Sequence, residues 1–200
     1  MKAGPREKIS RRLGVNLFLK GERSAGPKSA FTRRPYPPGL HGPKRQAKPS
    51  EYGLQLKEKQ KARFSYWVSE RQLRRYFVLA SKSKEKTGEK LLELLERRLD
   101  NVVYRLGFAS SRRQARQLVS HGFVRVDGKK IDIPSFKVSV GDKITLKRTL
   151  PNWQLPPHFA LPAWLKLDKK TLTGTVERFP VRDDIGFEID EKMIVEFYSR

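Results

Sequence analysis

Residues 110–131 read SSRRQARQLVSHGFVRVDGKKI, and this stretch decides the fold of the central part of the chain. At 100° per residue, its arginines and Ser120 fall on one side of a helix, while its small and apolar residues fall on the other. A serine at 110 or 111 can cap the helix and Gly122 can end it, so we expect a helix over about 111–121. The arginines on its polar side are Arg112, Arg113 and Arg116.

A tight hairpin is predicted directly after this helix. Residues 123–126 suit a strand, Asp127-Gly128 is the strongest two-residue hairpin signal, and residues 129–133 give the return strand. Because the turn is short, the helix and the hairpin would present their cations and polar groups around one surface. The residues that we expect on it are Arg112, Arg113, Arg116, Gln117, Ser120, His121, Lys129 and Lys130.

The composition points to a polyanionic partner. The chain has 44 Lys and Arg against 21 Asp and Glu, a formal net charge of +23 in 200 residues. Residues 1–50 hold 13 basic and 2 acidic residues, whereas residues 151–200 hold 7 and 8. Arginine-rich helices and loops suit phosphates, so nucleic acid is the natural partner. A membrane surface is the rival polyanion, but the chain has no run of 18 apolar residues, and MKAGPREKIS lacks the apolar core expected of a signal peptide.

The sequence argues against disulfide bonds and metal-binding sites. The chain has no cysteine, and its three histidines, at 41, 121 and 158, are far apart. We therefore expect no metal, no cofactor and no small-molecule substrate. The adjacent acids Asp183 and Asp184 are typical of a solvated turn, and no nucleophile and base set is present, so we expect the protein not to be an enzyme.

Residues 1–49 are predicted to be a basic arm. They contain seven prolines and six glycines with few apolar residues, so the arm should be loosely structured alone and should order on a partner. Its segment 33–45, RRPYPPGLHGPKR, is either a flexible basic tail or a stiff, partly polyproline-like strap laid along RNA. The residues of the arm that we expect to contact RNA are Arg11, Arg12, Arg33, Arg34 and Tyr36.

Helices are predicted from residue 50 onward. Ser50 can cap one, and Ser69 with Gln72 forms a capping box that opens a second, whose outward arginines Arg71, Arg74 and Arg75 are further candidates for RNA contact. A third should run without a break from about 87 to Gly107, with a broad apolar stripe. Strands are then expected at 144–147 and, from alternating apolar residues, in IPSFKVSV at 133–140.

The C-terminal quarter gives weaker signals. Prolines at 151, 156, 157 and 162 exclude a long regular element, and the aromatic residues Trp153, Phe159 and Trp164 should seal this connection against the core. Asp190 can cap a last helix through MIVEFY, although the alternation there also permits a strand.

Several blocks of this sequence resemble one known family over essentially the whole chain. They are RRPYPPGLHG, YGLQLKEKQKARF, ERQLRRYF, LLELLERRLDNVVYRLGFASSRRQARQLVSHG, VDGKKIDIPS, PAWL and VEFYSR. The family is that of small-subunit ribosomal protein S-four, of bacterial or organellar type, and the run from 91 to 135 is its most specific part. The resemblance implies an α+β fold, in which a helical domain is interrupted by an S-four-type RNA-binding domain of two helices and a small antiparallel sheet.

The domain boundaries expected from the residues and the resemblance together are as follows. Residues 1–49 form the arm, 50–94 and 165–200 the helical domain, 95–150 the RNA-binding domain, and 151–164 a proline-rich connection. The C-terminal segment thus returns to the helical domain.

The resemblance also implies a function and partners. The protein would be a structural constituent of the small ribosomal subunit, binding the 5′ domain of small-subunit ribosomal RNA near a multi-helix junction and starting assembly there. It would contact ribosomal protein S-five and other small-subunit proteins, and it would contribute to the channel through which messenger RNA enters and to translational accuracy. Lys44, Arg45 and Lys48 would face that messenger RNA. We expect the protein in ribosomes of the cytoplasm, with an organellar matrix as the other location.

Two departures from the family pattern are visible. Many members carry four zinc-binding cysteines in the arm, but the matching positions here are Glu7, Ser10, Ser24 and Ser29, so the arm should fold without metal. The stretch 151–162 is shorter than the helix-forming segment of many relatives.

Other classes of protein stay open at this point. The small RNA-binding domain also occurs in RNA-modifying enzymes and in other assembly or regulatory proteins. Two helices around GFASS near residue 107 also mimic a DNA-binding helix-turn-helix, against which the immediate hairpin and the basic arm argue. For the ribosomal interpretation, we expect the joint replacement of Arg112, Arg113 and Arg116 by alanine to weaken RNA binding without unfolding the protein.

Overall fold

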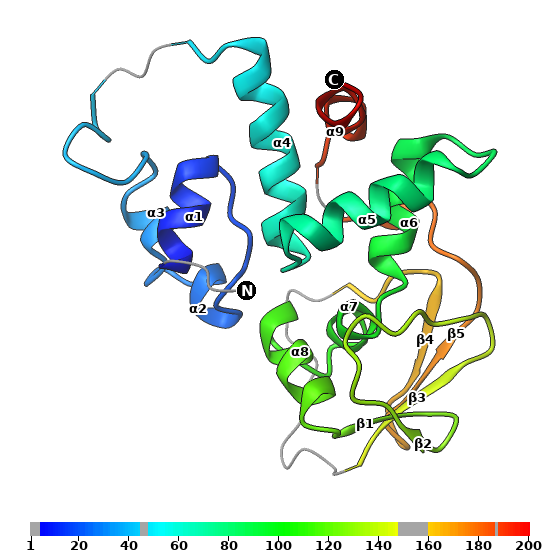
Figure 1. Ribbon diagram of the computed structural model, residues 1–200. Coiled ribbons are helices and arrows are strands. Elements are labelled where there is room, and N and C mark those ends of the chain that lie inside the picture. Colours follow the sequence, from blue (N-terminus) through cyan, green and yellow to red (C-terminus); the bar gives the residue numbers. More distant parts are fainter. Residues whose placement is uncertain (1–4, 45–47, 148–159, 187) are drawn as a thin grey trace. The chain divides into compact units, whose positions relative to one another are not determined.

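The structure is a computed structural model that describes residues 5–44, 48–147, 160–186 and 188–200. The chain forms two compact units (Figure 1). Unit 1 comprises Met1–Gly88 and Glu188–Arg200, and unit 2 comprises Glu89–Phe187. The α+β fold class is confirmed, because unit 1 is helical in its described part while unit 2 combines helices with an antiparallel sheet.

Three helices of unit 1 follow the capping signals of the sequence. Ser50 Oγ accepts the Gly53 N–H at the start of the first, and Ser69 forms the expected capping box with Gln72 at the start of the second. Asp190 accepts two backbone N–H groups at the start of the third, which settles the C-terminal segment as a helix. These helices are α4 (Glu51–Ser65), α5 (Glu70–Ser81) and α9 (Glu191–Tyr198), and α9 packs against the other two.

The prediction of a loosely structured arm is wrong for residues 5–33. This part contains three short helices, α1 (Arg6–Leu13), α2 (Glu22–Ala25) and α3 (Ala30–Arg33). Their few apolar side chains suffice for a small core, because Trp67 of the segment after α4 completes it. The core consists of Ile9, Leu13, Leu17, Leu19 and Trp67. Residues 34–44 are irregular, as their prolines require.

The third predicted helix is in fact two helices, α6 (Thr87–Glu96) and α7 (Leu99–Arg105). Arg98 between them is extended, with φ −70° and ψ 137°. The Leu99 N–H donates to the Phe136 carbonyl over 2.8 Å, and the Asp100 N–H to the Pro134 carbonyl over 3.2 Å. A helix start needs such acceptors, so residues 134–136 serve to begin α7 and are not the strand that their alternation predicted.

Helix α8 (Arg112–Ser120) and the hairpin after it match the prediction closely. Ser111 caps α8 by accepting the Gln114 N–H, and Gly122 follows its end with φ +69°. Asp127 and Gly128 both have positive φ, as a two-residue turn that matches the twist of the strands requires. The strands are β1 (Val124–Val126) and β2 (Lys129–Lys130), so the return strand is shorter than expected.

The sheet of unit 2 has five antiparallel strands in the order β2-β1-β3-β5-β4. Its other strands are β3 (Lys143–Leu146), β4 (Leu165–Asp168) and β5 (Thr173–Val176). Because β5 pairs with β3, residues 165–176 belong to the sheet. The expectation that residues 165–187 return to the helical domain is therefore wrong, and only the segment from 188 onward does so. A short 3₁₀ helix, η1 (Arg182–Asp184), follows the sheet.

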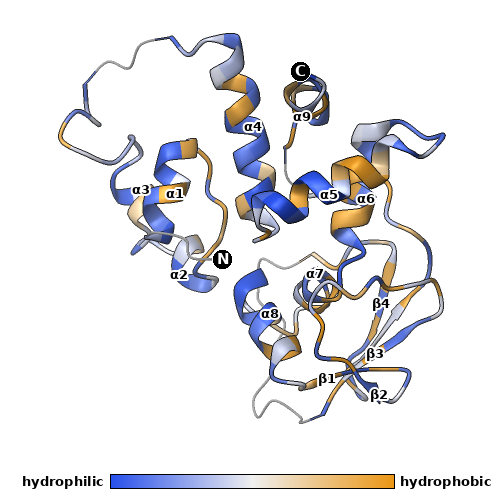
Figure 2. Ribbon diagram, viewed as in Figure 1, coloured by the Kyte–Doolittle hydropathy of each residue, from blue (hydrophilic) through white to orange (hydrophobic). Residues whose placement is uncertain are grey.

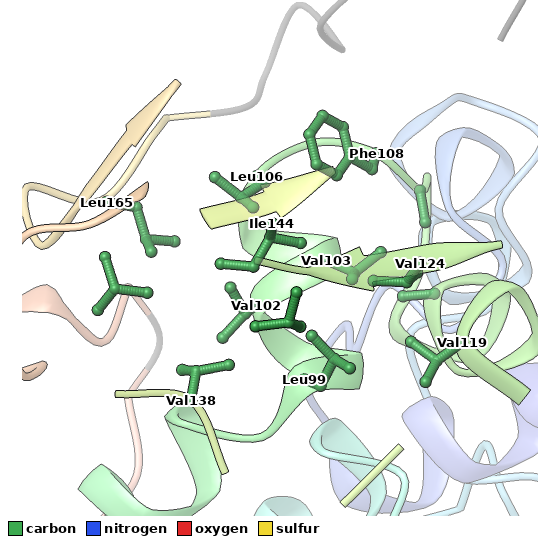
Figure 3. Packing of buried hydrophobic residues seen from close by; sticks show 14 of the residues in the cluster. Leu99, Val102, Val103, Leu106, Phe108, Val119, Val124, Val138, Ile144 and Leu165 are labelled. Carbon is green, nitrogen blue, oxygen red and sulfur yellow. The ribbon is translucent and has the colours of Figure 1, made fainter. Parts of the chain in front are cut away.

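One face of the sheet carries the core of unit 2 (Figure 3). Leu99, Val102 and Val103 of α7 and Leu106 at its end pack with Val119 of α8 on the inward strand residues. A side chain at position 174 would collide with Leu106, which explains the glycine at this point of β5. Trp164 is fully buried in the same core, as expected, whereas Trp153 and Phe159 lie outside the described residues.

Candidate nucleic-acid interface

The outward side of α8 and the hairpin form the first candidate surface, as predicted. Arg113, Gln117, Ser120 and His121 are exposed, and so are Lys129 and Lys130. The stem of Lys130 lies against Gly122, so closely that any side chain at 122 would collide with it. This contact brings the hairpin beside the end of α8, and Figure 2 shows how hydrophilic residues colour most of that helix. We call this set, with Arg116, the α8 surface.

Arg125 also belongs on the exposed side of β1, although it was not predicted as a candidate. It is exposed between buried Val124 and Val126, and it lies directly opposite Lys130 in the hairpin register. The sequence held a usable signal here, because an arginine between two valines in a strand points away from the core.

Arg112 was expected on the α8 surface but does not lie there. Its Nε donates to Asn101 Oδ1 over 2.7 Å, its guanidinium lies 4.6 Å from the centre of the Tyr104 ring, and its side chain is 11% exposed. Asn101 in turn donates to Glu96 Oε2 over 2.7 Å. Arg112 is therefore part of the interior of unit 2, so the joint alanine replacement would remove a buried contact as well as two cations nearer the surface.

Glu96 is the centre of this buried polar network. Its carboxylate is fully buried and accepts two hydrogen bonds from Arg105, one from Nε over 3.0 Å and one from Nη2 over 2.8 Å. The Arg112 Nη2 lies 4.0 Å from Glu96 Oε1. The carboxylate thus ties the end of α6 to α7 and α8.

Asp100 holds a second pair of arginines. Arg98 donates to it in a fork, from Nε to Oδ1 over 3.0 Å and from Nη2 to Oδ2 over 2.7 Å. Arg116 of α8 donates from Nη1 to the same Oδ2 over 3.4 Å. Burial raises the pKa of Asp100, whereas the guanidinium groups of Arg98 and Arg116 favour the ionised carboxylate.

One carboxylate holding two cations is a recurrent arrangement in this protein. The groups are Glu70 with Lys59 and Arg63, Glu93 with Lys90 and Arg97, Glu96 with Arg105 and Arg112, and Asp100 with Arg98 and Arg116. Burial alone would raise the pKa of Glu93, but the hydrogen bonds from Lys90 and Arg97 hold it below its ordinary value. Each of these acids contacts two cations, so the acids hold part of the basic charge in fixed positions.

The arginines of α5 form a second candidate surface, which lies in unit 1. Arg71, Arg74 and Arg75 are all exposed on this helix, as its apolar spacing predicted. Two exposed apolar residues, Val78 and Leu79, follow them on the same helix. Figure 2 shows α5 as largely hydrophilic along its first turns.

The arm contributes a third group of cations. Arg12, Arg33 and Arg34 are exposed. Arg11 has a different position from the one expected, because its Nε donates to the Arg34 and Tyr36 carbonyls over 2.9 and 3.0 Å. Its guanidinium also lies 5.0 Å from the centre of the Tyr36 ring and so occupies one face of it. Arg11 thus secures residues 34–37 to α1, and Tyr36 has only its other face for stacking.

The three other cations predicted in the arm were Lys44, Arg45 and Lys48. Lys44 and Lys48 are exposed, and Arg45 lies outside the described residues.

The four positions that match the family's zinc-binding cysteines hold side chains that form hydrogen bonds within the arm. Ser10, Ser24 and Ser29 are buried. Ser24 donates to Glu7 over 3.4 Å and accepts the Lys20 N–H, while Ser29 caps α3. Three hydroxyl groups with one carboxylate are a poor ligand set for zinc, which prefers thiolate and imidazole. Across the described ranges, no group of acids and histidines with metal-binding geometry is found, and no helix is long and apolar enough to cross a membrane.

Comparison with known proteins gives matches along nearly the whole chain. The model of the family described as Ribosomal protein S4/S9 N-terminal domain matches residues 2–96, and that of the S4 domain matches residues 97–144. The chain is 52% identical over 202 residues to small ribosomal subunit protein uS4 of Dictyoglomus turgidum, with 98% of each chain covered. It is 50% identical over 204 residues to the protein of the same name from Thermus thermophilus, again with 98% of each chain covered.

Proposed function

Since the chain belongs to the family of small ribosomal subunit protein uS4, we propose that it is a structural constituent of the small ribosomal subunit that binds small-subunit ribosomal RNA. Two relatives that are 52% and 50% identical to the chain, each over 98% of its length, support this assignment. Membership of this family also agrees with the expectation that the protein is not an enzyme.

The observation that carries the proposal is the α8 surface of unit 2. It presents cations together with the amide and hydroxyl groups of Gln117 and Ser120 on a helix that the core and two buried carboxylates hold in place. The deep, narrow major groove of an RNA helix hides its bases, so proteins recognise folded RNA mainly by phosphates, 2′-hydroxyls and shape. A rigid set of donors of this kind selects one arrangement of phosphates.

The residues that we assign to RNA contact are exposed, except for Arg116 and Tyr36, which are partly exposed. In unit 2 they are Arg113, Arg116, Gln117, Ser120, His121, Lys129 and Lys130, to which we add Arg125. In unit 1 they are Arg71, Arg74, Arg75, Arg12, Arg33, Arg34 and Tyr36. Arg112 and Arg11 are assigned instead to holding the protein's own structure, because their guanidinium groups donate to other parts of the chain.

From the family resemblance, we assign the 5′ domain of the ribosomal RNA, near a multi-helix junction, as the binding site. A protein that binds the folded junction and not its alternatives shifts the RNA towards the folded form by the difference in affinity. Binding free energy thus becomes RNA folding free energy, which is the physical basis of an early role in assembly.

Two finer assignments also rest on the family resemblance. Ribosomal protein S-five is proposed as a neighbour, and Lys44, Arg45 and Lys48 are proposed to face messenger RNA where it enters the subunit. Replacement of all three by glutamate should slow the unwinding of structured messages by reconstituted ribosomes. Normal unwinding by such ribosomes would remove these residues from the channel.

The test of the main proposal is a binding titration against the isolated 5′-domain fragment, with a junction-disrupted fragment of equal length as control. Both are measured at two salt concentrations, because contacts to phosphate alone weaken steeply as salt rises. A preference for the intact junction that survives the higher salt supports specific binding. Equal affinities that vanish together would mean that the charge of +23 accounts for the binding and would overturn the proposal.

A further inference from the structure

Arg116 differs from the other arginines of α8 because it is both held and accessible. Its side chain is 32% exposed, against 11% for Arg112. Its contact with Asp100 uses one nitrogen, Nη1, at 3.4 Å. A guanidinium has five N–H donors in a planar fork, so a single contact of this kind fixes its direction without consuming its capacity to donate.

Asp100 is itself hydrogen-bonded on both of its carboxylate oxygens. It is nearly fully buried at the start of α7, and the forked hydrogen bond from Arg98 fixes both of its oxygens. Arg98 is fully buried and lies opposite Lys137 in an isolated β-bridge, which anchors it to the loop that begins α7. The position of Arg116 on the outer side of α8 is thus tied through Asp100 to the interior of unit 2.

We propose that Asp100 is a positioning residue for RNA binding, which holds the Arg116 guanidinium in place so that it can donate to a backbone phosphate beside Arg113. The proposal rests on the proposed function and concerns the same surface. Arg113 and Arg116 are one helical turn apart on α8, and Arg113 is exposed. A held guanidinium loses less side-chain entropy on binding than a free one, and it can donate in a fork to phosphate oxygens.

This role makes an unusual prediction about charge. Replacing Asp100 with asparagine raises the net charge of the protein by one, so general attraction to RNA should become slightly stronger. If Asp100 positions Arg116, the same substitution should nevertheless weaken binding to the matched RNA. The two effects have opposite signs, and a change in charge alone cannot produce the second.

The experiment compares D100N with D183N in titrations of the intact and the junction-disrupted 5′-domain fragments. Asp183 is exposed in η1, so D183N makes the same change in net charge in the same unit and serves as the matched control. We expect D100N to lose about fivefold to tenfold in affinity for the intact fragment, the scale of one net hydrogen bond in water. Neither variant should bind the disrupted fragment more weakly than the parent protein.

A double-mutant cycle with R116A then tests whether Asp100 acts through Arg116. In the R116A background, D100N should cause no further loss of affinity, because the group that it positions is absent. An equal loss in both backgrounds would overturn the proposal, since Asp100 would then affect binding by another route.

R116K supplies a test that leaves the buried Asp100–Arg98 pair intact, in case D100N does not fold. Lysine keeps the charge but is a flexible point charge without a fork. R116K should lose nearly as much affinity as R116A, whereas parental affinity in R116K would overturn the proposal. A parent protein with no preference for the intact junction would instead overturn the proposed function, so the two failures are distinguishable.

Discussion

Helices α5 and α8 carry similar runs of arginine, in ERQLRRYF and SSRRQARQ, but the structure uses them differently. All three arginines of α5 point to solvent. On α8, Arg113 is exposed, Arg116 is half-buried against Asp100, and Arg112 lies in the interior beside Asn101 and Tyr104. Similar sequence patterns therefore have two roles. The arginines of α5 supply exposed charge, whereas two of the arginines of α8 are held in position by other side chains.

The difference comes from what each helix packs on. Helix α8 faces α7, whose first turn brings Asp100 and Asn101, and the end of α6 adds Glu96. Burying a carboxylate is costly unless it is paired and hydrogen-bonded, so these acids capture arginines from α8. Helix α5 begins with an acid of its own, Glu70, which pairs with Lys59 and Arg63 of α4. The three arginines of α5 remain exposed to solvent.

Removal of Glu96 should lower the free energy of unfolding more than any other change proposed, and it would test whether the buried acids hold α8 in place. The E96A substitution leaves Arg105, Arg112 and Asn101 without their common acceptor in a buried site. Breaking a buried pair in this way costs about 3–5 kcal/mol, so we expect the free energy of unfolding to fall by roughly that amount in urea denaturation. E177A, at an exposed glutamate 3.8 Å from exposed Lys166, is the control and should leave the urea midpoint nearly unchanged.

The α5 arginines should show the opposite behaviour. The triple replacement R71A, R74A and R75A removes three exposed cations and no buried contact, so the urea midpoint should stay the same. If each arginine neutralises one phosphate, the slope of log affinity against log salt should fall by about 2–3, and affinity at moderate salt should fall at least roughly tenfold. An unchanged salt slope would show that α5 contacts no RNA and that only α8 carries the binding function.

Arg112 and Arg113 allow the comparison to be made between adjacent residues of one helix. R112A should lower the free energy of unfolding by about 2 kcal/mol, because Asn101 and Glu96 lose a buried donor. R113A should leave that free energy unchanged and should instead weaken RNA binding by roughly threefold to tenfold. If R112A unfolds at the same urea concentration as the parent protein, the buried network does not stabilise unit 2 as argued.

The sequence predicted the local elements better than it predicted which side chains are buried. Caps at Ser50, Ser69, Ser111 and Asp190 and the Asp127-Gly128 turn were all found, because each depends on residues within a few positions of one another. The break at Arg98 was missed because its cause is distant, since residues 134–136 supply the acceptors that begin α7.

The same limit applies to the candidate site. Helical periodicity placed Arg112, Arg113 and Arg116 on one polar side, which is correct as geometry on an isolated helix. It could not reveal that α7 brings Asp100 and Asn101 against two of them. A clue was present in the acids and amide of ERRLDN, which lie among buried leucines and valines and so require partners. Pairing between helices decided the roles, and composition alone carried no information about it.

The smallest effect is expected from Glu70, the acid at the start of α5, and it sharpens the contrast with the buried acids near α8. Burial would raise the pKa of Glu70, but the hydrogen bond from Tyr198 over 2.7 Å and the Lys59 ammonium at 2.9 Å together lower it below the ordinary 4.5. A lowered carboxyl pKa in the folded state gives stability that is fully present above about pH 4.5 and is lost as the pH falls towards the folded value. In Y198F, the free energy of unfolding should therefore fall by a smaller amount between about pH 6 and pH 3.5 than it does in the parent protein.

The size of this effect and its control follow from exposure. Because Glu70 is 43% exposed, solvent screens its pairs, and we expect a difference of less than about 1 kcal/mol, measured by urea denaturation at each pH. Y52F, at a half-exposed ring of α4 beside Phe197, removes a tyrosine hydroxyl from another contact of α9 without touching Glu70 and serves as the control. An acid response of Y198F equal to that of Y52F would mean that Glu70 owes its lowered pKa to Lys59 and Arg63 alone. The lowered pKa of Glu70 in unit 1 would then have the same cause as that of Glu93 in unit 2, namely two cations beside one acid.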